Sequence, residues 1–124
     1  MDVKVIEARY KDRPKSDPAA RVFDIAAHTP EASEKIRSGR MYVGDEYRAV
    51  VITIGPGQAQ DIHMHPQTDH AWFIVSGQGE VTMEGGKIEK MQPGVFAVHP
   101  RGTVHGLRNT GKDPFVYIAL SIGE

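Results

Sequence analysis

The sequence predicts a small all-β protein, and two observations along its 124 residues lead to that prediction. From Tyr47 onward, short runs of β-branched and aromatic residues alternate with glycine- and proline-marked turns such as Gly55-Pro56-Gly57. Only one segment, which lies before Tyr47, carries the signals of a helix. Short strands about ten residues apart are typical of a sandwich or barrel rather than of alternating strands and helices.

The first 46 residues are predicted to form a strand, a loop and a short helix that pack on a barrel made by residues 47–124. Val3, Val5 and Ile6 indicate a short strand that lies against the barrel edge or against a second subunit. Two prolines and several charges between residues 11 and 20 indicate a loop.

The helix is predicted over residues 30–38. Thr29 is a suitable N-cap, and Pro30 fits the first helical position. Lys35 and Arg37 stand near the predicted end, and Gly39 provides the stop. The alternative for this segment is an irregular loop.

The barrel segment is predicted to contain seven strands, separated by turn residues. They are Arg48–Ile54, Gln60–His65, His70–Ser76, Glu80–Met83, Val95–Val98, Val104–Arg108 and Phe115–Ile122.

Composition narrows the functional classes. The chain has no cysteine, so a metal would be held by imidazole or carboxylate groups. With 15 basic and 16 acidic residues and no long basic run, a nucleic-acid partner is not expected. No stretch approaches the roughly 20 apolar residues of a membrane span, and the start is too charged for a signal peptide. We therefore expect a cytoplasmic protein without a membrane partner.

Four of the six histidines are arranged as a candidate metal site. His63 and His65 leave one face of a strand together, because side chains alternate along a strand. His70 opens the next strand after a tight turn, and His105 would come from another hairpin. A lone histidine is more often a satisfied core residue. Several neutral imidazoles that converge in an interior need a partner, and a metal ion supplies one.

The glycines and prolines around these histidines resemble the two motifs of the cupin superfamily. Gly57-(x5)-His63-x-His65-(x4)-His70-(x6)-Gly77 is similar to the first motif. Gly94-(x5)-Pro100-x-Gly102-(x2)-His105-(x3)-Asn109 matches every fixed position of the second. The resemblance implies a double-stranded β-helix, the cupin or jelly-roll barrel. It also implies that His63, His65 and His105 are metal ligands.

The resemblance has one departure, at position 70. Cupins usually have glutamate there, and His70 fills its place, which implies a four-histidine site for one divalent ion of Fe, Mn, Zn, Ni or Cu. Two alternatives stay open. Asp69 is a distant alternative ligand, and His70 could swing out and leave three histidines.

Several other residues have scaffold roles in this interpretation. Gly57, Gly94 and Gly102 are expected in turns that need positive φ or close backbone approach. Asn109 is expected to close a hairpin with its side chain, and His99 is expected to be a partly exposed structural residue.

The catalytic residues cannot be read from the motifs. Tyr47, Tyr117 and Met83 are candidates to line a pocket, and for each the alternative is an ordinary core position. Arg101 could bind an anion at the pocket mouth, or it could be a solvated turn residue.

An ion with only imidazole ligands keeps its full charge and favours anionic or chelating ligands. The resemblance therefore implies a metal-dependent enzyme for a small organic substrate, of dioxygenase type or an isomerase, lyase or cyclase. The alternatives are a non-catalytic module for a small ligand or sugar and, less favoured, a storage or structural protein. The resemblance to cupins also implies a homodimer, paired by sheet edges or by exchange of residues 1–8.

Overall fold

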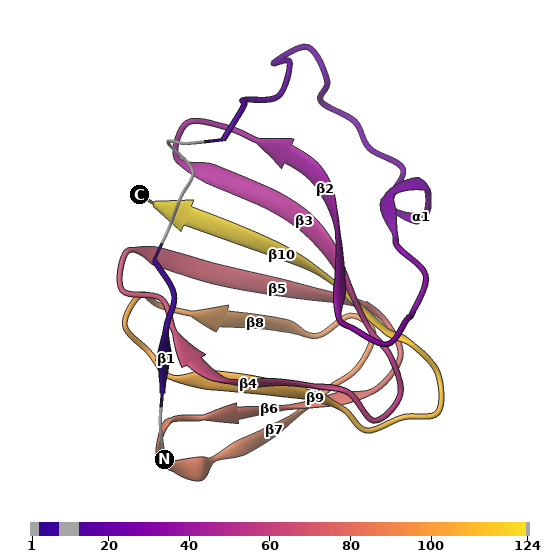
Figure 1. The fold of residues 1–124 in the computed structure, drawn as a ribbon, viewed down its shortest axis with the longest axis vertical. Coiled ribbons are helices and arrows are strands. Elements are labelled where there is room, and N and C mark those ends of the chain that lie inside the picture. Colours follow the sequence, from indigo (N-terminus) through magenta and orange to yellow (C-terminus); the bar gives the residue numbers. More distant parts are fainter. Residues whose placement is uncertain (1–2, 8–12, 124) are drawn as a thin grey trace.

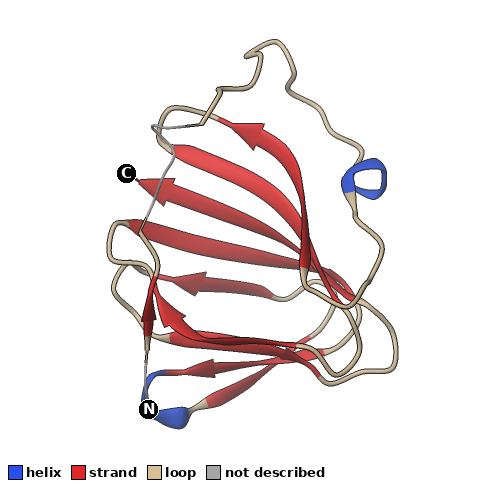
Figure 2. Ribbon diagram, viewed as in Figure 1, coloured by secondary structure: helices blue, strands red, loops and turns tan. Residues whose placement is uncertain are grey.

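The computed structural model describes residues 3–7 and 13–123, and it confirms the all-β prediction (Figure 1). Strands dominate, with one short helix and one 3-10 turn in the described residues (Figure 2). The elements are β1 (Lys4–Val5), α1 (Ile25–His28), β2 (Arg37–Val43), β3 (Tyr47–Ile54), β4 (Ala59–Met64), β5 (Thr68–Ser76), β6 (Gly79–Met83), η2 (Glu84–Gly86), β7 (Ile88–Met91), β8 (Phe96–His99), β9 (His105–Asn109) and β10 (Phe115–Gly123).

The strands form two five-stranded sheets that enclose the core between them (Figure 1). One sheet has the order β1-β4-β9-β6-β7, and the other has the order β2-β3-β10-β5-β8. Strand β1 runs parallel to β4, and the remaining neighbours are antiparallel. Long crossovers between the sheets bring strands that are far apart in the sequence side by side, such as β4 and β9.

The inner face of each strand is set by side-chain alternation. In β10, Phe115, Tyr117 and Ala119 face the interior, which the sequence alone left open. Trp72 of β5 and Leu107 of β9 lie in the same core. Full burial of one large apolar side chain contributes about 1.5–3 kcal/mol, so this shared interior holds the two sheets together.

The prediction of a helix over residues 30–38 is wrong. The helix is a single turn, Ile25–His28, and Asp24 caps it by accepting a hydrogen bond from the Ala26 amide. It ends at Thr29 because the residue before a proline disfavours the helical region. The Pro30 carbonyl then accepts a hydrogen bond from the Thr53 hydroxyl, which ties the segment to β3. Pairing with the sheet outweighs the local helix signals.

Two strands were missed in the sequence. Strand β2 pairs with β3 from Arg37 to Val43, so the chain before residue 47 contributes a strand to the second sheet. Strand β7 pairs with β6 after a turn in which Gly85 and Gly86 both have positive φ. Its two central residues, Glu89 and Lys90, are charged and exposed, which hid the strand pattern.

The hydrogen bonds of Asn109, at the end of β9, confirm the prediction that its side chain closes a hairpin. Its side-chain amide donates hydrogen bonds to the carbonyls of Ile54 and Asp113, at 2.8 and 2.9 Å. Its side-chain oxygen accepts one from the Gly111 amide at 2.8 Å. One buried side chain thus satisfies three backbone groups and fixes the turn into β10.

Substituting Gly39 by alanine is expected to destabilise the protein, because a Cβ atom at this position would collide with the His28 carbonyl oxygen. We expect the free energy of unfolding to fall by about 1–3 kcal/mol, as for other overpacked positions. Urea unfolding of Gly39→Ala measures this loss. Ser38→Ala, at the exposed neighbouring position, is the control and should leave the midpoint nearly unchanged. Equal midpoints for both variants would contradict the contact.

The described segments, 3–7 and 13–123, contain no helix with the length and apolar content needed to cross a bilayer.

Candidate metal centre

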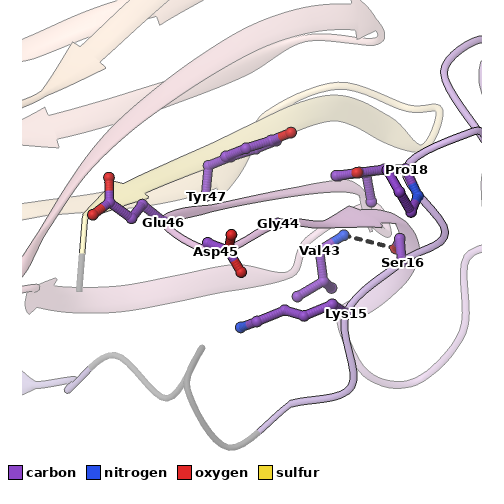
Figure 3. Close-up of a pocket in the computed structure, with 9 residues that line it drawn as sticks. Lys15, Ser16, Pro18, Val43, Gly44, Asp45, Glu46 and Tyr47 are labelled. Atoms are coloured by element: carbon purple, nitrogen blue, oxygen red, sulfur yellow. Dashed lines mark hydrogen bonds between the residues drawn. The ribbon is translucent and has the colours of Figure 1, made fainter.

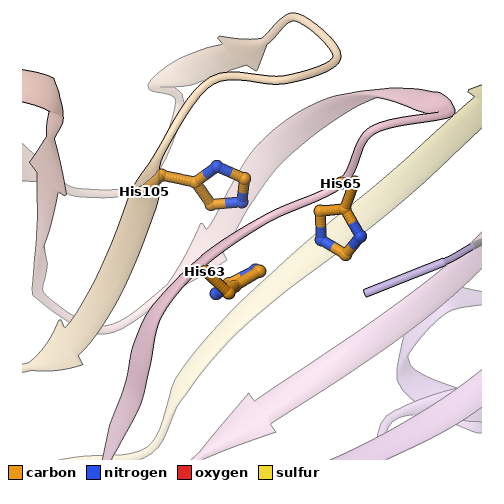
Figure 4. A group of neighbouring side chains, drawn as sticks. All are labelled: His63, His65 and His105. Carbon is orange, nitrogen blue, oxygen red and sulfur yellow. The ribbon is translucent and has the colours of Figure 1, made fainter. Parts of the chain in front are cut away.

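Three histidines come together inside the barrel (Figure 4). His63 in β4 lies directly opposite His105 in β9, and His65 follows just beyond the end of β4. One ligand nitrogen from each ring lies within 4.8 Å of the others. Ring centroids are 4.4 Å apart for His63 and His105, and 4.9 Å apart for His63 and His65.

An irregularity in the pairing of β4 and β9 places His63 on the inner face. Gln60 pairs with Leu107 and His63 pairs with His105, so three steps on β4 match two steps on β9. Such a bulge resets the alternation of side chains. Gln60 and His63 therefore share the inner face although an odd number of residues separates them.

Backbone carbonyls orient two of the rings. The His63 Nδ1–H donates to the Asp61 carbonyl at 2.7 Å, and the His105 Nδ1–H donates to the Thr103 carbonyl at 3.3 Å. With Nδ1 protonated, the lone pair of each ring is on Nε2. The His105 Nε2 is buried and has no protein partner. Metal-ligating histidines are held in this way by a backbone carbonyl on the other nitrogen.

Burial favours the neutral form of His65 and His105, as metal binding requires. It lowers the pKa of His65 to about 4 and that of His105 further, and neighbouring histidines add to both effects. For His65, a hydrogen bond with the backbone of Ile6 partly opposes this lowering of the pKa. The segment after β1 thus reaches the ligand group.

These residues fit a divalent transition metal ion. Three neutral nitrogen donors converge, one of them buried and unpaired, and a buried unpaired nitrogen is costly without a partner. Imidazole donors suit zinc, copper, iron and nickel. The barrel and the histidine cluster together define a site that could bind such an ion.

His70 lies beside this cluster but outside the group of three. Its ring stacks on that of His65, with 3.9 Å between centroids. Both ring nitrogens have hydroxyl partners, the Thr68 hydroxyl at 2.9 Å on Nε2 and the Ser121 hydroxyl at 3.2 Å on Nδ1. Neither partner was predicted from the sequence. Thr68 could have been found by strand alternation, whereas Ser121 required the β5–β10 register.

His99 corrects the sequence expectation of partial exposure. Only 3% of this residue is exposed, and burial lowers its pKa to about 4. Its ring stacks on His105 at a centroid distance of 4.1 Å. The histidine environment of the site is therefore larger than the motifs indicated.

Asp69 and Arg101 bind each other at the barrel rim. The Asp69 carboxylate accepts hydrogen bonds from the Arg101 backbone amide at 2.8 Å and from its guanidinium at 3.2 Å. These contacts lower the pKa of Asp69. The carboxylate is thus engaged by arginine instead of by the histidine cluster.

The surroundings differ among the three residues predicted to line a pocket, Tyr47, Met83 and Tyr117. Tyr47 is 42% exposed, stacks on Tyr42, and lines a surface cleft of about 530 Å³ that none of the histidines lines (Figure 3). Met83 is half-buried and lies opposite His105 in the β6–β9 pairing. Tyr117 is fully buried beside Trp72, and burial raises the pKa of its hydroxyl.

The Tyr117 hydroxyl has no hydrogen-bond partner in the described structure. We expect Tyr117→Phe to raise the free energy of unfolding by about 1 kcal/mol, because it removes an unpaired buried polar group. Thermal unfolding measures the change, and Tyr42→Phe, at a partly exposed position, is the control. A lower melting temperature for Tyr117→Phe would indicate that the hydroxyl has a partner in solution.

The fold and the histidine cluster define a double-stranded β-helix protein with a candidate metal site. The Cupin_2 family model, described as a cupin domain, matches residues 50–122. The chain therefore belongs to the cupin family.

Two curated relatives are enzymes by name. The chain is 30% identical over 89 residues to dimethylsulfoniopropionate lyase DddQ of Ruegeria pomeroyi, covering 72% of this chain and 43% of the lyase. It is 28% identical over 81 residues to mannose-1-phosphate guanylyltransferase 2 of Escherichia coli O157:H7, covering 65% of this chain and 17% of that enzyme. The chain thus spans less than half the length of each.

Solved structures share the fold. A Klebsiella pneumoniae protein with a double-stranded β-helix domain superposes with a TM-score of 0.76 at 24% identity, covering 83% of this chain and 90% of that one. The DddQ structure superposes with a TM-score of 0.62 at 28% identity, covering 73% and 47%.

Proposed function

We propose that this cupin is a metal-dependent enzyme that acts on a small anionic or chelating organic substrate. The observation that carries the proposal is the convergence of His63, His65 and His105, with the buried His105 Nε2 lacking a protein partner. A bound divalent ion would supply Lewis-acid activation of a substrate oxygen. The three histidines would hold the ion, and the surrounding core would exclude bulk water.

The neutral ligand set supports an anionic substrate. The group of three contains no carboxylate, and Asp69 nearby is neutralised by Arg101. The ion would therefore keep its full positive charge and attract a carboxylate or enolate. We favour lyase or isomerase chemistry over oxygen chemistry, because the similarity to DddQ extends over 72% of this chain.

Activity assays of the metal-loaded protein test this proposal. The protein is stripped, loaded separately with Fe, Mn, Co, Ni, Cu or Zn, and offered small hydroxy acids, uronates, dicarbonyls and sulfonio-carboxylates. Proton NMR follows the products, and an electrode follows oxygen. We expect oxygen-independent turnover with at least one metal. Turnover coupled to oxygen uptake would indicate a dioxygenase, and tight substrate binding without turnover would indicate a non-catalytic binding module.

We further propose that His70 completes a four-histidine site when the ion is bound. Its stacking on His65 supports this, because a small ring movement would exchange one hydroxyl partner for the metal. Cobalt absorption spectra of the wild-type protein and His70→Ala test it. A weaker and shifted visible band is expected for the variant. Identical spectra would indicate that His70 is not a ligand and that the ion has three histidine ligands.

We also propose a homodimer formed through the outer face of β5 and β8. Phe73 and Phe96 pair across these strands with 46% and 60% exposure, and Val98 beside them is 52% exposed. An exposed apolar patch of this kind on a sheet is typical of an interface. Phe96→Glu should shift the protein toward the monomer in sedimentation experiments, whereas Ile88→Glu, also exposed but on the other sheet, should not. A wild-type monomer would contradict the proposal.

A further inference from the structure

His99 is an interior residue of the barrel. It is the last residue of β8, where it pairs with His70 of β5. Directly paired residues of neighbouring strands share a face of the sheet, so both rings lie on the inner side. Their low exposure, 3% for His99 and 9% for His70, agrees with this placement.

Two aromatic neighbours hold the His99 ring in place. It stacks on His105 with 4.1 Å between centroids and 16° between planes. The indole of Trp72 meets it edge-on, with centroids 4.2 Å apart. The Pro100 that follows restricts the backbone of His99 to extended conformations. The position of the imidazole is therefore fixed by packing on the proposed ligand His105.

The His99 Nε2 is buried and has no hydrogen-bond partner in the described structure. By contrast, both nitrogens of His70 are bound to hydroxyls. An unpaired buried nitrogen is costly, and a phenylalanine would pack in the same space without that cost. The nitrogen therefore indicates a polar partner that reaches this part of the interior.

His99 does not belong to the ligand group itself, which in the described residues consists of His63, His65 and His105. Imidazole nitrogens bind in the plane of their ring. Because the His99 and His105 planes are nearly parallel and stacked, their lone pairs do not aim at one point. A group bound to an ion on His105 could extend across to the plane of His99.

We propose that His99 is a substrate-binding residue, whose Nε2–H donates a hydrogen bond to an anionic oxygen bound at the metal ion. The inference rests on the proposed function, because it requires the ion and its anionic ligand. It assigns to this chain a fifth histidine with a role in substrate affinity rather than in metal affinity. The donor would select ligands that present a second oxygen beside the metal-bound one.

Titrations of the cobalt-loaded protein with acetate test the role of His99. Cobalt content is measured first, and the visible cobalt spectrum then reports acetate binding. His99→Phe keeps an aromatic ring without a donor, and His99→Gln restores an N–H near the Nε2 position. His28→Phe, which removes a histidine in α1, is the matched control.

We expect His99→Phe to bind one cobalt ion per chain like the wild type but to bind acetate about tenfold more weakly, as for loss of one hydrogen bond to a charged group. His99→Gln should recover much of the acetate affinity, and His28→Phe should match the wild type. Unchanged acetate affinity in His99→Phe would overturn the proposal, as would loss of cobalt, which would make His99 a ligand. Failure of the wild type to bind cobalt would instead refute the proposed function.

If His99→Phe fails to fold, nitrogen NMR of the zinc-loaded wild type provides the readout. The His99 Nε2 resonance, assigned by its absence in His99→Gln, should shift on addition of acetate while keeping the signature of a protonated, metal-free nitrogen. A resonance that does not move would overturn the proposal.

Discussion

Replacing His105 by alanine is expected to lower the affinity for a divalent transition metal more than about a hundredfold, because loss of even an outer-shell partner costs about 10–100-fold. His105 is 1% exposed, and its Nε2 has no other partner. The ion would keep His63 and His65, with His70 as the proposed fourth ligand, but it would lose the buried donor that has no other role. Competition with a chromogenic chelator measures the affinity for zinc and cobalt.

The control for this substitution is His28→Ala. His28 lies at the end of α1, where its Nδ1–H donates to the Asp24 carbonyl, and it should leave metal affinity unchanged. Circular dichroism checks that His105→Ala keeps its β structure, since a folded variant is needed for the comparison. If His105→Ala binds one zinc ion with wild-type affinity, the metal is held elsewhere.

Acidification is expected to destabilise the metal-free protein between about pH 6.5 and pH 4. Burial lowers the pKa of His70 to about 3 and that of His99 to about 4, from 6.5. Between the folded-state pKa of each histidine and the unfolded value of 6.5, the unfolded chain binds protons that the folded chain does not. The free energy of unfolding therefore falls as the pH falls. For His99 alone the loss would reach about 3 kcal/mol at 1.36 kcal/mol per pKa unit.

Urea unfolding of the stripped protein from pH 7.5 to pH 4 measures this loss. His99→Phe should show a shallower dependence on pH, because it removes one of the buried imidazoles. His28→Ala is the control and should follow the wild type, because it removes a histidine of α1 and leaves the interior histidines in place. Unfolding midpoints that do not change over this range would show that the buried histidines accept protons in the folded state.

The strands could be predicted from the sequence more completely than the candidate metal site. Seven strands were predicted because alternating apolar residues and glycine-marked turns are local signals, and each lies within about two residues of an observed strand. The spacing around His63 and His105 was sufficient to identify the family that the domain match shows. Asn109 was assigned correctly because its hydrogen bonds are mostly to nearby backbone.

What could not be predicted depends on pairing between distant segments. Strand β2 is defined by its register with β3, which outweighs the helix signals at Thr29 and Pro30. The burial of His99 follows from its pairing with His70 on another strand. No sequence spacing indicates that Ser121 would meet His70, because 51 residues separate them. These contacts are properties of the assembled barrel.

The central claim is that the interior histidines hold one metal ion. Anomalous diffraction at the zinc edge from a crystal of the zinc-loaded protein tests it most directly. We expect a single strong peak about 2.0–2.1 Å from one nitrogen each of His63, His65 and His105. A crystal grown with zinc that shows no peak at these rings, or a peak only on surface residues, would contradict it.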